Sequence, residues 1–226
     1  MTSDAETPHP PATAAFGHVL VGGPSLTYPS PGVADPTISK FAVGPYDNNV
    51  YVVASDGEAI VLDAAAEPDR ILREVEGLRV TAIVQTHNHP DHTAALPALV
   101  EALAVPVLAH PDDRMPVPTE PLASGDRVRA GEVELVVVHT PGHTPGSLCF
   151  LLERDGAEPH LFTGDTLFPG GPGSTAGDRG RFERIMRSLD ELFALPDATR
   201  VSPGHGLDTT IGRERPYVET WRGRGW

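Results

Sequence analysis

The sequence contains little cysteine, little positive charge and no long apolar run. Cys149 is the only cysteine among 226 residues, which excludes an intramolecular disulfide. There are 17 Lys and Arg against 31 Asp and Glu, and the formal net charge of −14 would repel phosphate backbones, so we expect no nucleic-acid partner. No segment approaches the roughly 20 apolar residues of a spanning helix, and the first residues lack the basic start and apolar core of a secretory signal. These absences predict a cytoplasmic protein that does not enter a membrane.

The composition is that of one folded domain. With 39% hydrophobic and 21% charged residues, a chain of 226 residues fits a single domain with an ordinary core. Residues 1–37 carry repeated prolines among small and polar residues without sustained periodicity, which predicts an extended, Pro-rich arm. We therefore expect residues 38–226 to form the folded domain.

Apolar patterning predicts a mixed α/β fold. The predicted strands are 38–43, 49–54, 58–63, 80–85, 105–109, two runs within 126–139, 147–153 and 160–163. The predicted helices are 68–75, 94–103 and 182–195. Asp56-Gly57 is placed as the turn of a β-hairpin, and Cys149 as a buried thiol inside a strand.

Three histidines and an aspartate fall within six residues, directly after an apolar run. Alternate residues of an extended segment project to one side, so His87 and His89 can point together. Asp91 and His92 lie beyond Pro90, which redirects the chain. One ion cannot easily take all four ligands, so the spacing indicates two neighbouring metal positions. Imidazole nitrogen and carboxylate oxygen suit zinc, with iron or manganese as substitutes.

Three further candidate ligands, His143, Asp165 and His205, lie downstream. Each follows an apolar, β-like run on a short loop bounded by Gly or Pro, so all three are expected at strand ends, where residues distant in the sequence converge. A lone histidine is more commonly a structural or surface residue. We interpret His110, His139 and His160 in that way.

Four motifs occur in a fixed order. They are HxHxDH at 87–92, GHTPGS at 142–147, GDTLF at 164–168 and PGHG at 203–206. Together they resemble the metallo-β-lactamase superfamily of metallo-hydrolases, and specifically its glyoxalase II-like branch. The resemblance covers about residue 38 to the C-terminus and implies the four-layer αββα sandwich of that superfamily.

The resemblance also implies a role for each ligand. His87, His89 and His143 would hold the first metal, and Asp91, His92 and His205 the second. Asp165 would bridge the two ions, which makes Asp91 and Asp165 part of the catalytic centre. The family has an aspartate at the position of Asp63 that supports the metal ligands from behind, although a helix or turn cap is the other interpretation of this residue.

The implied cofactor is a pair of divalent ions, in the first place Zn²⁺. Two ions about 3.5 to 4 Å apart hold a hydroxide between them, because metal binding lowers the pKa of water toward about 7. This bridging hydroxide would attack the carbonyl of a small thioester, and the thiolate would leave without a general acid. The sequence therefore predicts a glyoxalase II-like hydrolase acting on an acylated thiol such as S-lactoylglutathione.

Other activities of the superfamily stay open. Persulfide dioxygenases keep the HxHxDH motif but bind one iron through residues equivalent to His87, His143 and Asp165, whereas His205 in its own motif favours two metals. Hydrolysis of another small ester or a lactone is a further alternative. β-Lactam hydrolysis fits less well, because Cys149 does not lie at a ligand motif. A binding protein with a decayed site is disfavoured, because no candidate ligand is missing.

The residues after the GDTLF motif bear on the substrate. Many glyoxalase II-like proteins carry a Gly-Arg or Gly-Lys pair here that can meet a carboxylate of glutathione, whereas this sequence has Gly173-Ser174. Arg179 and Arg181 either compensate from the same loop or are solvated charges at the start of the next helix. We also expect no counterpart of the helical substrate domain that longer glyoxalase II enzymes append. We expect Ser174, Arg179 and Arg181 to lie near the substrate, and a thiol carrier different from or smaller than glutathione.

Overall fold

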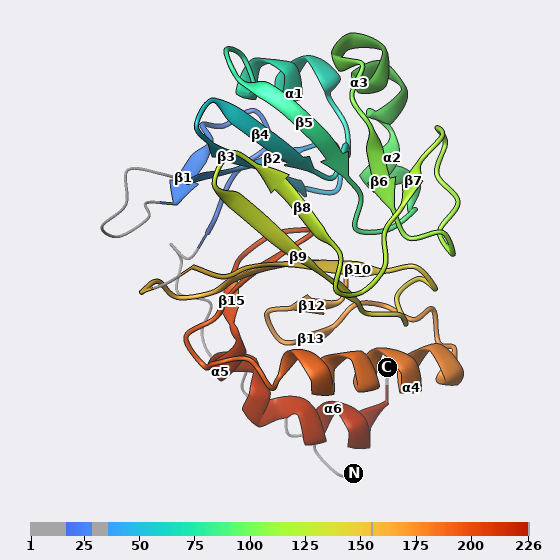
Figure 1. The fold of residues 1–226 in the computed structure, drawn as a ribbon. Helices are drawn as coiled ribbons and strands as arrows, with labels where there is room; N and C mark the ends of the chain where they lie inside the picture. The colour runs from blue at the N-terminus through green and yellow to red at the C-terminus, as the bar shows by residue number, and fades with distance from the viewer. Residues whose placement is uncertain (1–16, 29–35, 155, 226) are drawn as a thin grey trace.

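The computed structural model describes residues 17–28, 36–154 and 156–225 and is built around two β-sheets (Figure 1). The seven strands of the first sheet lie in chain order: β1 (Leu26–Tyr28), β2 (Thr37–Val43), β3 (Asn48–Ser55), β4 (Glu58–Leu62), β5 (Arg79–Val84), β6 (Val107–Ala109) and β7 (Glu120–Pro121). Strands β1 to β4 pair antiparallel, whereas β4 to β7 run parallel. Asp56 and Gly57 join β3 to β4 with φ angles of 51° and 75°, which confirms the predicted hairpin turn.

The second sheet has six strands. Their order is β15 (Thr209–Thr210), β14 (Arg200–Pro203), β11 (His160–Gly164), β10 (Leu148–Leu152), β9 (Val133–His139) and β8 (Arg127–Ala130). Both β9 and β11 run antiparallel to β10, and β14 runs parallel to β11, so β9, β11 and β14 end at the same edge. Two short strands, β12 (Leu167–Phe168) and β13 (Gly171–Pro172), form a separate hairpin.

Helices cover the outer face of each sheet (Figure 1). They are α1 (Pro68–Glu74), α2 (Pro90–Thr93), α3 (Leu96–Leu103), α4 (Arg179–Leu192), α5 (Ile211–Glu214) and α6 (Val218–Arg224), with a 3-10 turn, η1 (Arg215–Tyr217), between the last two. Helices α1 and α3 lie on the first sheet, and α4 and α6 on the second. Within the described part of the chain, no helix combines the length and apolar character needed to cross a membrane.

Three apolar cores separate these four layers. Between the sheets, Ile60 of β4 and Phe150 of β10 belong to one buried cluster. A second cluster joins the first sheet to its helices and includes Leu99 of α3. A third joins the second sheet to its helices and includes Ile185 of α4 and Trp221 of α6. The predicted αββα sandwich is therefore confirmed.

Two local expectations need correction. Leu26–Tyr28 falls in the predicted Pro-rich arm, but it forms β1 and pairs with β2, and Tyr28 is buried. Three residues are too few to show the two-residue period of a strand, which is why the pattern missed it. The parts of the predicted arm before residue 17 and from residue 29 to residue 35 lie outside the described residues. The helix predicted over 94–103 is shorter and follows a separate turn, α2, that begins at Pro90.

Candidate metal centre

The predicted ligands lie on loops at one edge of the two sheets. In the first sheet, β4 leads to Asp63 and its parallel neighbour β5 leads to the loop of His87. In the second sheet, β9, β11 and β14 lead to His143, Asp165 and His205. Carboxyl ends of parallel strands meet at one edge of a sheet, so residues that are distant in the sequence come together there.

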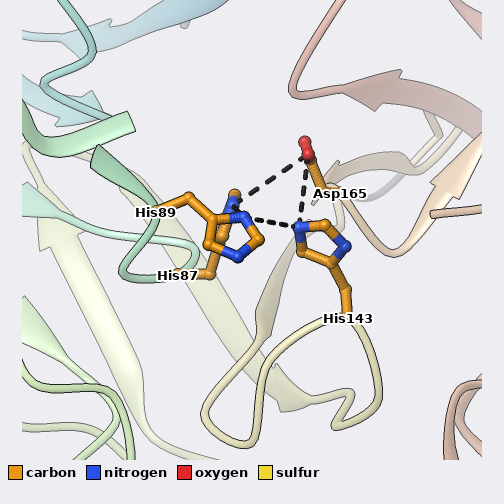
Figure 2. Close-up of side chains that lie close together, drawn as sticks. All are labelled: His87, His89, His143 and Asp165. Atoms are coloured by element: carbon orange, nitrogen blue, oxygen red, sulfur yellow. Dashed lines mark hydrogen bonds and ion pairs between the residues drawn. The ribbon is translucent and has the colours of Figure 1, made fainter. Parts of the chain in front are cut away.

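His87, His89, His143 and Asp165 form the first cluster (Figure 2). His89 Nδ1 lies 3.2 Å from His87 Nε2 and 2.9 Å from His143 Nε2. Asp165 Oδ2 lies 3.4 Å from His143 Nε2 and 4.0 Å from His87 Nε2. Three rings and one carboxylate from three different loops therefore face one another, as the figure shows.

Asp91, His92 and His205 form the second cluster. His92 Nε2 lies 3.0 Å from His205 Nε2, and Asp91 Oδ2 lies 3.7 Å and 3.5 Å from these two nitrogens. Asp91 and His92 belong to α2, so the chain turns at Pro90 between the ligands of the two clusters. All seven predicted ligands thus fall into two groups, with Asp165 in the first, and the assignment of each to a metal ion stays a prediction.

Asp165 lies between the two clusters. Its Oδ2 is 3.5 Å from His205 Nε2, and its Oδ1 is 3.5 Å from His92 Nε2. Oδ1 is buried and has no hydrogen-bond donor among the described residues. A buried carboxylate oxygen without a partner costs free energy, and a cation on this oxygen would remove that cost.

Hydrogen bonds behind the rings determine which ring nitrogen carries the proton. His143 Nδ1–H donates to the carbonyl oxygen of Ser174 at 2.8 Å, and His205 Nδ1–H donates to the carbonyl oxygen of Tyr46 at 2.7 Å. Because a carbonyl only accepts, Nδ1 must hold the proton in both rings. In the neutral imidazole, Nε2 then turns its lone pair toward the cluster.

Asp63 supports one ring in each cluster. Its Oδ2 accepts hydrogen bonds from His92 Nδ1–H at 2.9 Å and from the Thr86 hydroxyl at 2.8 Å, and its Oδ1 accepts from the Thr86 amide at 2.8 Å. Because the Thr86 hydroxyl hydrogen is taken, its oxygen is free to accept from His87 Nδ1–H at 3.0 Å. The Nε2 atoms of His87 and His92 are thereby directed inward. These contacts agree with the supporting role that the resemblance implies for Asp63.

The electrostatics of the two clusters differ. Burial, together with the neighbouring His92, lowers the pKa of His87 well below its usual value, and burial lowers the pKa of the other two first-cluster rings. Burial would also lower the pKa of His92, but the hydrogen bond and charge of Asp63 and the charge of Asp165 raise it to about 9. Burial would raise the pKa of Asp165, but its bond with His205 and the nearby His92 and His87 hold it far below its usual range. In the second cluster, nearby carboxylates therefore favour a positive charge on the rings. In the first cluster, burial keeps the ring nitrogens neutral.

The donor set fits divalent metal ions. His89 Nδ1 and His143 Nε2 lie 2.9 Å apart, close enough for a hydrogen bond between the rings or for both nitrogens to bind one cation. Imidazole nitrogens with a carboxylate oxygen are the ligands that zinc and other first-row metals take. The first cluster would hold one such ion and the second cluster another, with Asp165 in reach of both.

Comparison with known proteins agrees with this geometry. The family model described as the metallo-beta-lactamase superfamily matches residues 43–205, a span that contains every candidate ligand. The chain belongs to the metallo-beta-lactamase superfamily. The resemblance predicted from the four motifs is confirmed.

Individual superfamily members give the comparison more detail. An Aquifex aeolicus protein described as uncharacterized is 36% identical over 202 residues, covering 80% of this chain and 94% of its own. A hydroxyacylglutathione hydrolase of Albidiferax ferrireducens is 37% identical over 161 residues, covering 70% of this chain but only 62% of its own length. Among solved structures, TTHA1623 in a di-iron-bound form has a TM-score of 0.68 at 35% identity, covering 78% of this chain and 96% of its own. ETHE1 from Myxococcus xanthus has a TM-score of 0.70 at 31% identity, covering 79% and 81%.

The three residues predicted near the substrate have other contacts in this superfamily domain. Ser174 is exposed, and its backbone carbonyl accepts the bond from His143. The Arg179 side chain is 91% exposed and pairs with Glu183. Arg181 Nε donates to the carbonyl of Gly142 at 3.1 Å, and another nitrogen of Arg181 donates to the carbonyl of His143. Arg181 thus holds a ligand loop, and contact of Ser174, Arg179 or Arg181 with substrate stays a prediction.

The mouth of the site involves residues that the motifs do not include. A hollow of about 420 Å³ opens beside the second cluster and is lined by Tyr46, Pro90, Asp91 and His205. Tyr46 is 68% exposed, and its backbone carbonyl holds the His205 ring. Asn48 donates a 2.9 Å hydrogen bond to Asp91 Oδ2. Both residues lie at the β2–β3 turn, and the sequence analysis missed them, although the polar run Asp47-Asn48-Asn49 that leads into the second predicted strand could have drawn attention to this turn.

Buried donors also hold the loop of His205 from behind. Lys40, which is fully buried, donates to the Gly206 carbonyl at 2.7 Å and pairs with Asp208 at 2.8 Å. Asn49 donates to the carbonyl of Pro203 at 2.9 Å. Lys40 is the only lysine of the chain, but its sequence context, inside a predicted strand, gives no indication of this role.

Proposed function

We propose that this protein is a dinuclear, metal-dependent hydrolase that cleaves a small thioester. One observation carries the proposal: seven ligands form two adjoining clusters whose ring nitrogens face inward, with Asp165 within 4.0 Å of rings in both. The similarity to a hydroxyacylglutathione hydrolase over most of this chain supports the substrate class. The similarity to a di-iron-bound structure supports two ions and keeps iron beside zinc as a candidate metal.

Different residues of the site would have different roles in catalysis. Divalent ions held here would lower the pKa of water and polarise a carbonyl oxygen. Asp165, from its place between the clusters, would fix the distance between the two positions. Asp91 is held by Asn48 at the mouth of the site and would orient the water from the open side. Asp63 keeps the lone pairs of His87 and His92 directed at the ions, through Thr86 and directly.

The protein offers no competing cysteine nucleophile. Cys149 is fully buried in β10, and burial raises the pKa of its thiol to about 11. A thiol of this kind is neither ionised at neutral pH nor accessible to a substrate. Cys149 therefore does not compete with the water that divalent ions held by the two clusters would activate, and a thiolate leaving group would need no general acid.

The test combines metal analysis with substrate profiling. Protein purified without added metal should hold about two ions per chain and release thiol from thioesters. The panel should include glutathione and non-glutathione thioesters of one acyl group, together with esters and lactones. His110→Gln is the matched control, because it removes a histidine outside both clusters and should leave metal content unchanged. Faster cleavage of an oxygen ester or lactone than of every thioester would replace the thioester proposal with another metallo-hydrolase activity.

A mononuclear-iron persulfide dioxygenase is the second candidate. His87, His143 and Asp165, the three ligands it needs, lie together in the first cluster, and the similarity to ETHE1 leaves this activity open. The deciding variant is His205→Gln, which removes a ligand of the second cluster alone. It should lower thioester hydrolysis steeply if two ions are needed. One iron per chain, oxygen uptake on glutathione persulfide and indifference to His205→Gln would identify the dioxygenase instead.

A further inference from the structure

A buried carboxylate outside both clusters joins two of the ligand loops. Asp113 lies in the turn that follows β6, in a segment that the sequence indicates only as a Pro-rich loop, and is 2% exposed. Its Oδ2 accepts from the Asn88 amide at 3.1 Å and from the Thr144 hydroxyl at 2.6 Å. Its Oδ1 accepts from the Gly146 amide at 2.8 Å. All three donors belong to ligand loops.

These contacts connect loops that come from different sheets. Asn88 stands between His87 and His89, on the loop that leaves β5 of the first sheet. Thr144 and Gly146 follow His143, on the loop between β9 and β10 of the second sheet. The loops are also joined at their base, where the Leu148 amide donates to the Thr86 carbonyl at 2.8 Å. Asp113 adds a side-chain link to that backbone bond, with one hydrogen bond to the first loop and two to the second.

The glycine in the GHTPGS motif makes room for this carboxylate. A Cβ placed on Gly146 would lie 2.8 Å from both Cβ and Cγ of Asp113 and 2.9 Å from its backbone nitrogen. Atoms do not approach so closely without a shift, so a larger residue would push Asp113 out of its three hydrogen bonds. Gly146 and Asp113 therefore act as one unit, although they lie far apart in the sequence.

The second cluster does not use this unit. Its rings are held by Asp63 and by the Tyr46 carbonyl, and its carboxylate by Asn48. None of the three hydrogen bonds of Asp113 goes to any of these groups. Loss of Asp113 should therefore affect the two clusters unequally.

We propose that Asp113 is a positioning residue that sets the distance between His87 and His89 on one side and His143 on the other, and so preorganises the first metal site selectively. The proposal rests on the proposed function only in requiring that the first cluster binds an ion. Groups that hold metal ligands in place typically account for about 10- to 100-fold in metal affinity. Asp113→Asn replaces one acceptor oxygen with a donor, so at least one of the three bonds is lost.

The experiment measures metal affinity without reference to turnover. Apo-protein is titrated with Zn²⁺ in competition with a chromophoric chelator, and with Co²⁺ to follow ligand geometry by absorption. The His205→Gln background removes a second-cluster ligand, so the binding event that remains reports the first cluster. In that background, Asp113→Asn should weaken binding at least about tenfold and change the Co²⁺ spectrum. Asp126→Asn is the matched control, because Asp126 caps an exposed turn at the Ala123 amide and should change neither.

Two further variants keep the test decisive. Thr144→Val removes the 2.6 Å bond to Asp113, together with the 2.8 Å bond between the Thr144 and Ser147 hydroxyls, and should weaken the first site by a smaller factor. Gly146→Ala should reproduce Asp113→Asn without altering a charge. Equal weakening of both sites in the native background, accompanied by a lower Tm of the apo-protein, would show a general structural role and overturn the proposal. Unchanged affinity in all three variants would overturn it as well.

The outcomes also separate this proposal from the proposed function. If the wild-type protein binds two ions and Asp113→Asn binds them as tightly, only the role of Asp113 fails. If the wild-type protein binds two ions but cleaves no thioester, only the proposed substrate fails. A wild-type protein that binds no ion would overturn both.

Discussion

The two ligand clusters differ in burial and in what holds them. In the first cluster, the side chains of His87 and His143 are 1% and 7% exposed. In the second, His92 is fully buried, but Asp91 and His205 are 29% and 24% exposed, and the His205 ring is held by the carbonyl of exposed Tyr46. The first site is thus preorganised between two sheets, whereas the second opens to the hollow at the mouth. We infer that the second position is the more exchangeable and the one that meets the substrate.

Asp165 is the one residue that the clusters share, and its removal should have the largest effect. Asp165→Ala takes away Oδ1, which lies 3.5 Å from His92 Nε2, and Oδ2, which lies 3.5 Å from His205 Nε2 and 3.4 Å from His143 Nε2. Both ions should be lost or misplaced, and kcat should fall by about three orders of magnitude, more than for any single second-cluster histidine. Metal content and kcat are to be measured together. Near-normal turnover with two bound ions would contradict the position assigned to Asp165 between them.

Lys40 tests how much stability comes from the buried pair behind the second cluster. Burial lowers the pKa of Lys40, although Asp208 opposes this shift, so the charge is retained at a cost. Lys40→Met removes the nearer cation of buried Asp208 and leaves Arg200 at 3.5 Å, so the variant should lose at most the stability that removing one partner of a buried pair costs, about 3 to 5 kcal/mol. Urea unfolding measures this loss. The double variant Lys40→Met/Asp208→Asn should recover part of it, and an unchanged free energy of unfolding in Lys40→Met would sink the idea.

Sequence reasoning identified the candidate ligands and Asp63 behind them, but it did not identify the other groups that hold the ligand loops. His87, His143 and His205 lie in short motifs at strand ends, where residue type and spacing already indicate the chemistry. Asp113 and Lys40 act on amides and carbonyls of loops that are distant along the chain. A backbone amide does not depend on residue type, so the sequence does not indicate which side chain binds it.

The fold shows the same division. The turn at Asp56-Gly57 was predictable because both residues favour a positive φ, and this preference acts locally. The strand Leu26–Tyr28 was not, because only its pairing with β2 distinguishes three residues from coil. Local preference was readable from the sequence, and pairing across the fold was not.

Asp63 offers a test of the difference between the two clusters, because it hydrogen-bonds His92 directly but reaches His87 only through Thr86. Asp63→Asn should weaken metal binding in the second cluster by about 10- to 100-fold and in the first by less. Chelator competition on the native and His205→Gln backgrounds separates the two. Asp69→Asn, at an exposed position of α1, is the control. Equal loss at both sites would show that Thr86 transmits the full effect.

The buried side chain of His160 leads to a prediction of how acid lowers the stability of the protein. It is buried, it bonds the Ser202 hydroxyl at 2.7 Å, and burial with the charge of Arg200 lowers its pKa to about 3. An unfolded histidine titrates near about 6.5, so the unfolded state takes the proton first, and the stability present above pH 6.5 is lost as the pH falls toward 3. The contribution lost by pH 5 is about 2 kcal/mol. Urea unfolding at pH 7 and pH 5 should show a smaller decrease for His160→Gln than for wild type. An exposed-site control, His18→Gln, should follow wild type, and parallel decreases in all three would exclude His160 as the cause.

The smallest expected effect concerns two arginines that the sequence treats alike. Arg179 is exposed and paired with Glu183, whereas Arg181 donates to the carbonyls of Gly142 and His143 beside the first cluster. An exposed ion pair contributes at most about 1 kcal/mol, so Arg179→Ala should change kcat/KM for a glutathione thioester less than about fivefold. Arg181→Ala should lower metal affinity at the first site, because it frees the loop of His143, and this loss should be the same whichever thioester is used. Comparing glutathione and non-glutathione thioesters of one acyl group separates the two roles. A loss confined to the glutathione ester in Arg181→Ala, at unchanged metal content, would show that Arg181 meets the substrate and that its bonds to the ligand loop are secondary.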